Sequence, residues 1–101
     1  DLFAVVPATA DMIAKFATGF GDDIVSASAL SLPATCPKIF CPAMNTQMWE
    51  NPAVQQNVTL LEQRGWIRVG PDSGLMACGT VGAGRMSDVD SILNAITNVL
   101  A

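Results

Sequence analysis

The sequence contains no histidine, and it has only five lysine and arginine residues against nine aspartate and glutamate residues. Histidine is the usual general base and the usual partner of a nucleophilic serine or cysteine, so those pairings are excluded within these 101 residues. A net charge of −4 without a basic cluster argues against a nucleic-acid surface, because phosphate backbones require clustered positive charge. Any phosphate bound here is therefore expected to be held by backbone amides.

Long apolar runs are also missing. No run approaches the roughly 18 residues that a membrane span needs, and no charged segment followed by an apolar one opens the chain. We therefore expect a cytoplasmic protein with no membrane partner. With half of its residues hydrophobic, the chain can bury a real but modest core.

Three cysteines are present, Cys36, Cys41 and Cys78, and an odd number cannot all pair within one chain. Their spacings match no zinc-binding pattern, and no histidine is available to complete one. The sequence therefore predicts free thiols and no metal site.

The chain begins with a continuous apolar run, residues 2–6, which predicts a central parallel strand that ends at Pro7. A helix follows, with apolar residues on one face (Met12, Ile13, Phe16 and Ala17) and glycines at its end. Thr9 or Asp11 can cap this helix, and its first-turn amides can donate to an anion or to the polar edge of a cofactor. Capping alone explains these residues equally well.

The remaining elements alternate in the same way. We expect a helix over 24–30 behind Asp22 and Asp23, a strand at 38–41, a helix from the Asn51–Pro52 cap to Gly65, and a strand at 66–69. A capping box of Ser87 and Asp90 is expected to open a final amphipathic helix. The apolar residues of that last helix are Val89, Ile92, Leu93, Ile96, Val99 and Leu100.

Apolar strands alternating with helices predict an α/β fold, a three-layer sandwich with a parallel sheet joined by right-handed crossovers. Three strands make a poor complete sheet. We therefore expect residues 1–101 to be the second half of one doubly wound domain whose first strands lie upstream.

Polar recognition is expected at the carboxyl ends of these strands, where open parallel sheets hold ligands. The central candidate is the stretch 42–49, in which Asn45 and Trp49 follow Pro42, although spacing alone favours an ordinary strand-to-helix connection. The long stretch 70–86 places Cys78 among glycines, which favours a mobile lid over a plain linker.

Three segments resemble the flavin-containing cysteine decarboxylases. They are Pro-Ala-Thr-Ala-Asp-Met-Ile-Ala-Lys at 7–15, Pro-Ala-Met-Asn-Thr-Gln-Met-Trp at 42–49 and Ala-Cys-Gly-Thr-Val-Gly-Ala-Gly-Arg-Met at 77–86. The resemblance spans nearly the whole chain with the segments in the family's order. It implies a flavodoxin-like fold and a homo-oligomer built from trimers, with FMN held between subunits.

The same resemblance implies roles for individual residues. The FMN site would be lined by Thr9, Ala10, Asp11, Met12 and Ala43. Asn45 would hold the substrate carboxylate, Ala77 and Met86 would contact the substrate, and Cys78 would be the acid that protonates the product. Thr80 stands where the family has a carboxylate. The family's histidine base and first FMN-phosphate loop have no counterpart in these residues.

The implied reaction is the FMN-dependent decarboxylation of phosphopantothenoylcysteine to phosphopantetheine in coenzyme A biosynthesis. The flavin oxidises the thiol to a thioaldehyde, which accepts the electron pair that CO2 leaves behind. Two alternatives remain open. A peptidyl-cysteine decarboxylase would stop at the ene-thiol and would not need Cys78, and a non-catalytic flavin-binding regulatory subunit would supply only part of a composite site.

Overall fold

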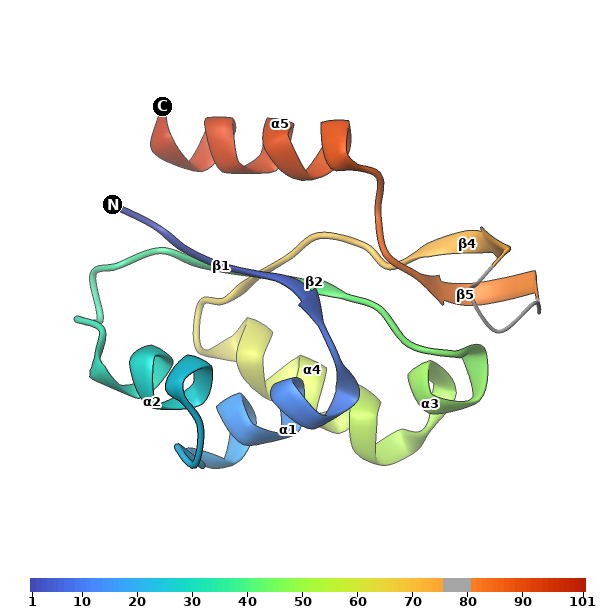
Figure 1. Ribbon diagram of the computed structural model, residues 1–101, viewed down its shortest axis with the longest axis horizontal. Helices are drawn as coiled ribbons and strands as arrows, with labels where there is room; N and C mark the ends of the chain where they lie inside the picture. The colour runs from blue at the N-terminus through green and yellow to red at the C-terminus, as the bar shows by residue number, and fades with distance from the viewer. Residues whose placement is uncertain (76–80) are drawn as a thin grey trace.

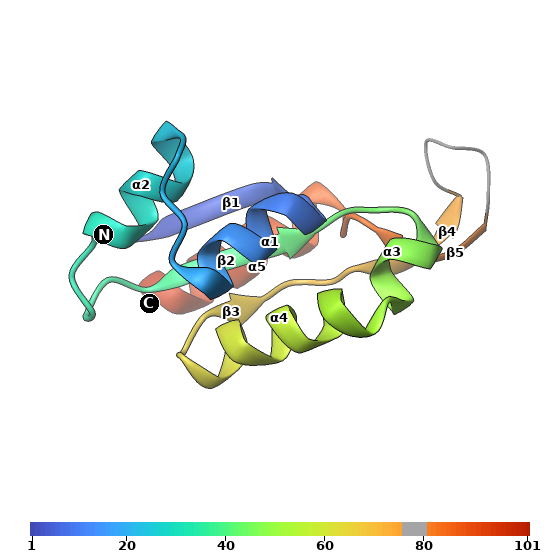
Figure 2. The ribbon, with the colours of Figure 1, turned by 90° about the horizontal axis from the view of Figure 1, so that it is seen from below.

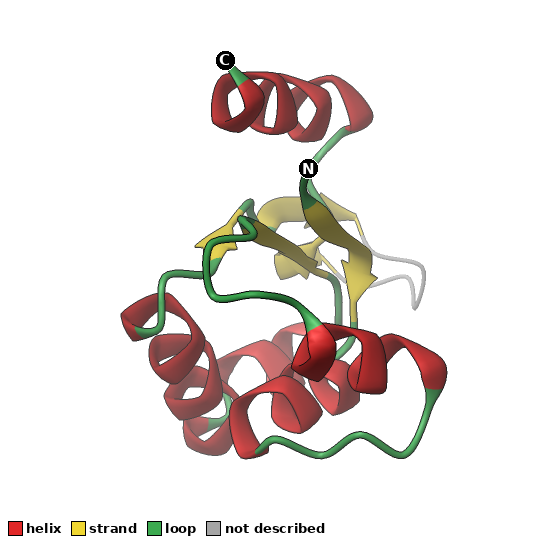
Figure 3. Cartoon of the chain, turned by 90° about the vertical axis from the view of Figure 1, so that its left-hand side faces the viewer, coloured by secondary structure: helices red, strands yellow, loops and turns green. Residues whose placement is uncertain are grey.

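A computed structural model describes residues 1–75 and 81–101 of the chain as a layered α/β structure (Figure 1). Strands β1 (Phe3–Ala8), β2 (Lys38–Pro42) and β3 (Ile67–Arg68) form a parallel sheet in that spatial order. Helices α1 (Ala10–Thr18), α2 (Ile24–Ser31), α3 (Thr46–Glu50) and α4 (Pro52–Gln63) lie on one side of it. Helix α5 (Val89–Leu100) lies on the other side, as Figure 3 also shows. This is the predicted three-layer arrangement.

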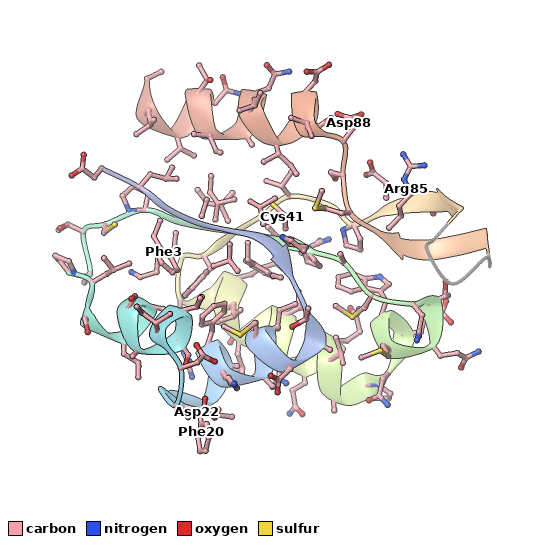
Figure 4. The ribbon with its side chains drawn as sticks, in the orientation of Figure 1. Phe3, Phe20, Asp22, Cys41, Arg85 and Asp88 are labelled. Carbon is pink, nitrogen blue, oxygen red and sulfur yellow. The ribbon has the colours of Figure 1, made fainter. Side chains whose placement is uncertain are left out.

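The middle strand, β2, is buried on both faces. Phe40 packs into the cluster on the side of α1 and α4, whereas Ile39 and Cys41 pack with Ile92 of α5. All three β2 side chains are completely buried, and Figure 4 marks Cys41 on this strand. An apolar run without alternation is what a strand covered by helices on both faces requires.

β1 continues one residue beyond the predicted end at Pro7 and stops at Ala8. Among the described residues it pairs with β2, and Val6 is 45% exposed. The apolar run predicted this strand correctly. Its expected central place in a sheet with further strands upstream stays a prediction.

Capping side chains start the first helices, as the sequence predicted. The Thr9 hydroxyl accepts the Met12 N–H at 3.2 Å, and Asp23 forms a reciprocal capping box with Ser26 at the start of α2. Asn51 accepts the Ala53 N–H at 2.9 Å and is followed by a proline in the first turn of α4. Each cap satisfies amides that have no partner inside the helix.

The predicted cap of α5 is wrong. Asp88, not Ser87, is the cap residue, and its carboxylate accepts the Ser91 N–H at 2.8 Å. Ser87 is instead buried, with its hydroxyl 3.2 Å from a carboxylate oxygen of Asp72. The hydrogen bond from Ser91 lowers the pKa of Asp88, and the nearby Arg85 acts in the same direction (Figure 4).

The stretch 70–86 was expected to be a lid or a linker, but most of its described part is a hairpin. β4 (Asp72–Leu75) and β5 (Val81–Arg85) pair antiparallel, and the hairpin projects from the end of the sheet beside α3 (Figure 2). Residues 76–80 lie outside the described part of the chain. Among the described residues, no helix is long and apolar enough to cross a membrane.

Candidate functional site

Two of the three predicted ligand-binding segments meet at one edge of the sheet. Ala8, the last residue of β1, pairs with Pro42 of β2, and the Ala43 N–H donates to the Ala8 carbonyl at 3.0 Å. Thr9 and the first turn of α1 therefore lie next to the segment that leads to Asn45. This edge, formed by the carboxyl ends of parallel strands, is where such sheets bind ligands.

The first turn of α1 supplies the residues predicted to contact FMN. Thr9 is exposed and caps this nine-residue helix, which begins directly after the carboxyl end of β1. The first-turn amides that have no partner inside the helix therefore lie at this edge of the sheet. Met12 lines an open groove of about 410 Å³ between β1 and α2, together with apolar residues that include Val6 and Pro7. The edge thus combines backbone donors with an apolar wall.

Asp11 lies in this turn and is drawn into a cluster of charges. Its carboxylate is 3.4 Å from the Lys15 ammonium group, which also lies 3.0 Å from Asp22 and 2.8 Å from Asp23. Hydrogen bonds to Asp23 and Asp22 raise the pKa of Lys15, and the same contact with Lys15 lowers the pKa of Asp23 to about 2. The cluster joins α1 to the segment that starts α2.

Asn45 is the cap residue of α3, a short helix that the sequence did not reveal. Its side-chain Oδ1 accepts the Met48 N–H at 2.9 Å, and the residue is exposed. Because the cap uses the oxygen of the amide, the NH2 group is the part of this side chain that can donate to a ligand. An asparagine after a buried strand was the available signal, but the turn-like composition of 42–49 hid the helix.

Trp49 and Met48 follow Asn45 within α3. Trp49 is partly buried against the main core, and its ring lies 5.7 Å from the Arg68 guanidinium carbon. Met48 is 43% exposed and does not belong to the buried core. Of these two residues, Trp49 is the one that packs on the core.

The hairpin approaches the Asn45 segment through residues that the sequence did not single out for this purpose. The Thr46 hydroxyl donates to the Ala83 carbonyl at 2.6 Å, and the Met44 N–H donates to the Gly84 carbonyl at 2.9 Å. The glycines of this stretch were interpreted as a source of backbone freedom. In the structure, Gly82 and Gly84 instead allow β5 to lie close to the Asn45 segment.

The other predicted substrate residues are not all brought to this edge. Met86 follows β5 and packs with Ile39, Cys41 and Ile92 on the α5 side of the sheet. Ala77 and Cys78 lie outside the described residues, so their predicted roles stay predictions.

The described cysteines have no disulfide partner. Cys41 is completely buried, and burial raises its pKa, so it remains a thiol. Cys36 is partly buried, and its sulfur lies 3.6 Å from the Pro37 carbonyl. Among the described side chains, no group of three or more potential ligands could hold a metal ion.

Comparison with known proteins decides the family. The sequence profile of the Flavoprotein family matches residues 1–101. The chain belongs to the Flavoprotein family. This confirms the resemblance inferred from the three motifs.

Curated relatives of this Flavoprotein domain are enzymes of coenzyme A biosynthesis by name. The chain is 47% identical over 100 residues to the probable phosphopantothenoylcysteine decarboxylase of Streptococcus mutans, covering 99% of this chain and 56% of that protein. It is also 47% identical over 94 residues to the coenzyme A biosynthesis bifunctional protein CoaBC of Escherichia coli K12, covering 93% of this chain and 23% of that one. The chain thus spans about half the length of the first relative and less of the second.

Solved structures share the fold. A mutant PPC decarboxylase complexed with pantothenoylaminoethenethiol aligns with a TM-score of 0.95 and 26% identity, over 98% of this chain and 54% of that chain. The FMN-dependent cysteine decarboxylase SpaF aligns with a TM-score of 0.77 and 34% identity, over all of this chain and 53% of that one. The FMN-binding protein AtHal3 aligns with a TM-score of 0.87 and 28% identity, over 97% of this chain and 53% of that one. The flavodoxin-like α/β fold is therefore confirmed.

Proposed function

We propose that this domain belongs to an FMN-dependent enzyme that decarboxylates 4'-phospho-N-pantothenoylcysteine to 4'-phosphopantetheine in coenzyme A biosynthesis. The observation that carries the proposal is the meeting of the α1 cap and the Asn45 segment at one sheet edge, joined by the hydrogen bond between Ala43 and Ala8. The curated relatives named for this activity support it.

The α1 edge fits a flavin. A flat ring system with polar edges needs an apolar wall and a few fixed donors. Met12 and the groove beside β1 provide the wall, and the first-turn amides beyond Thr9 provide the donors. We assign Thr9, Ala10, Asp11, Met12 and Ala43 to this cofactor. Bound FMN would supply a two-electron oxidation of the cysteine side chain. The oxidised side chain would then accept the electron pair of the breaking carbon–carboxylate bond.

The chain's own residues position the substrate. The Asn45 NH2 group, set by its cap, donates to the substrate carboxylate. A neutral donor orients the carboxylate without forming an ion pair with it. An ion pair would stabilise the charged substrate more than the transition state in which neutral CO2 departs, and would so slow the reaction. We further assign Ala77 to the substrate chain and Cys78 to the proton delivered to carbon, and we propose a cytoplasmic homo-oligomer built from trimers. Met86 is left out of this assignment, because its side chain packs with Cys41 and Ile92 on the α5 side of the sheet.

A peptidyl-cysteine decarboxylase is the second candidate, because EpiD, solved with the substrate peptide DSYTC, aligns with this chain with a TM-score of 0.81 and 26% identity. The two candidates differ in their products. The first reduces the ene-thiol formed after CO2 loss, whereas the second releases it.

One experiment separates the candidates. The purified full-length protein is examined for a flavin absorption band and then incubated with phosphopantothenoylcysteine, and CO2 and the thiol product are measured by mass spectrometry. We expect a flavin band, CO2 and phosphopantetheine. A flavin band with an ene-thiol product would favour the peptidyl-cysteine class. A flavin band without CO2 from this substrate or from a peptide ending in cysteine would support a regulatory flavin-binding subunit and refute both.

A further inference from the structure

Asn45 lies between two residues that are both bonded to the hairpin. The Met44 N–H donates to the Gly84 carbonyl at 2.9 Å, and the Thr46 hydroxyl donates to the Ala83 carbonyl at 2.6 Å. Two successive carbonyls of β5 thus accept from the residues immediately before and after Asn45. The sheet itself holds this segment through Ala43, on the Met44 side of Asn45.

Two glycines make this contact possible. A Cβ on Gly84 would overlap the Met44 carbonyl oxygen, and a Cβ on Gly82 would lie 2.6 Å from the Thr46 hydroxyl oxygen. Any side chain at either position would push β5 away from the Asn45 segment. The close approach is therefore specific to this pair of glycines and to the hydroxyl of Thr46.

Two hydrogen bonds set the direction of the Asn45 side-chain amide. Its own oxygen is fixed by the Met48 N–H, which sets the side chain relative to α3. The start of α3 is fixed in turn by Thr46, whose hydroxyl reaches across to β5. Loss of that hydroxyl leaves the cap intact and lets the whole cap move relative to the hairpin.

We propose that the Thr46 hydroxyl is a positioning group for substrate binding, because it fixes the start of α3 to β5 and so directs the Asn45 NH2 group at the substrate carboxylate. The inference rests on the proposed function and adds a residue to it. Thr46 contacts neither the substrate nor the cofactor in this account. Its effect passes through Asn45.

The test uses the full-length, FMN-loaded protein and three variants. Thr46→Val has the same shape without the hydroxyl, Thr46→Ala lacks the hydroxyl and is smaller, and Thr46→Ser keeps the hydroxyl. For each, KM for phosphopantothenoylcysteine and the inhibition constant of phosphopantetheine, which has no cysteine carboxylate, are measured in the same CO2-release assay. Loss of one neutral hydrogen bond predicts a rise in KM of about 5-fold for Val and Ala. The inhibition constant should stay within about 2-fold of wild type by the same reasoning, and Ser should restore KM.

A general packing role gives a different pattern. KM and the inhibition constant would then worsen together, in step with a lower melting temperature, and this result would overturn the proposal. A double variant gives a second criterion, because contacts that act through one another are not additive. Thr46→Val should add little to KM in an Asn45→Asp background, and full additivity would also overturn the proposal.

The wild-type control separates this inference from the function on which it rests. A wild-type protein that releases no CO2 from the substrate refutes the proposed function, and the role of Thr46 falls with it. An active wild type whose Val and Ala variants keep a normal KM refutes the role of Thr46 alone.

Discussion

Replacing Gly84 with alanine tests how the hairpin is held against the Asn45 segment. Gly84 is buried, has a φ of +124° and accepts the Met44 N–H at 2.9 Å. Its added Cβ would overlap the Met44 carbonyl oxygen and lie 3.3 Å from the Asn45 carbonyl carbon. Both neighbours are backbone atoms, which cannot rotate away as a flexible side chain can.

The expected cost has two parts. An alanine held at this φ costs about 1–3 kcal/mol of backbone strain, and the lost hydrogen bond to Met44 costs about 1 kcal/mol more. Gly65→Ala is the matched control, because Gly65 has a φ of +92° and no atom within 4 Å of the added Cβ. Gly65→Ala should therefore lower the free energy of unfolding only by the backbone-strain cost.

Amide hydrogen exchange measures the difference directly, with urea unfolding as the measure of global stability. In Gly84→Ala we expect the Met44 N–H to exchange faster, by at least about 5-fold for the loss of one hydrogen bond, and the unfolding midpoint to fall below that of Gly65→Ala. In Gly65→Ala the exchange of Met44, relative to global unfolding, should match wild type. Equal Met44 exchange and equal midpoints in the two variants would refute the contact between β5 and the Asn45 segment.

Three further predictions concern other parts of the chain. Trp49→Ala should lower the free energy of unfolding by about 2–3 kcal/mol, since the ring is only partly buried, and any loss of turnover should track the melting temperature; lost turnover at an unchanged melting temperature would contradict the packing role. The Asp23 pKa is lowered from 3.8 to about 2, first by Lys15, so its contribution to stability is complete above about pH 4 and disappears as the pH falls through about 2. Asp23→Asn should flatten the dependence of melting temperature on pH in that window, and an unchanged slope would contradict the role of the cluster. Cys78→Ser should still release CO2 but should accumulate the ene-thiol, which has two hydrogens fewer than phosphopantetheine, because a serine hydroxyl is a far weaker acid than a thiol; normal product at the wild-type rate would leave Cys78 without this role.

Much of the fold could be predicted because local signals agreed with the final packing. The Asn51–Pro52 cap, the Thr9 cap and the apolar run at 39–41 each have a physical reason that needs no distant partner. The pairing of β1 with β2 is not visible in either strand alone, because an apolar run is the same whatever strand pairs with it. The neighbours of a strand are set by the topology of the sheet and not by its own residues.

The sequence indicated that two of the candidate segments meet at one edge of the sheet, but not how they are held there. Strand ends identified the edge at Thr9 and Asn45, but the hairpin was hidden because its strands are rich in glycine, a weak strand former. The glycines of this stretch suggested a flexible backbone, whereas in the structure Gly82 and Gly84 allow β5 to pack closely against Thr46 and Met44. The partner of each glycine lies almost forty residues away in sequence, and local patterns do not report contacts at that distance.

The proposed contact between Asn45 and the substrate carboxylate is tested by the KM of Asn45→Asp for phosphopantothenoylcysteine. Aspartate keeps the oxygen that accepts the Met48 N–H and caps a helix as well as asparagine, so the melting temperature and flavin content should hold. It replaces the donating NH2 group with a negative charge. Two charges about 4 Å apart repel by roughly 1 kcal/mol in water and roughly 4 kcal/mol near a protein surface.

That repulsion predicts a KM between about 5-fold and about 800-fold above wild type. Asn51→Asp is the control, because Asn51 is also an exposed cap residue, accepting the Ala53 N–H at 2.9 Å at the start of α4. It should leave KM within about 2-fold of wild type, since the added charge lies in another cap. We expect KM to rise in Asn45→Asp and not in Asn51→Asp, and a wild-type KM in Asn45→Asp would show that Asn45 does not hold the substrate carboxylate.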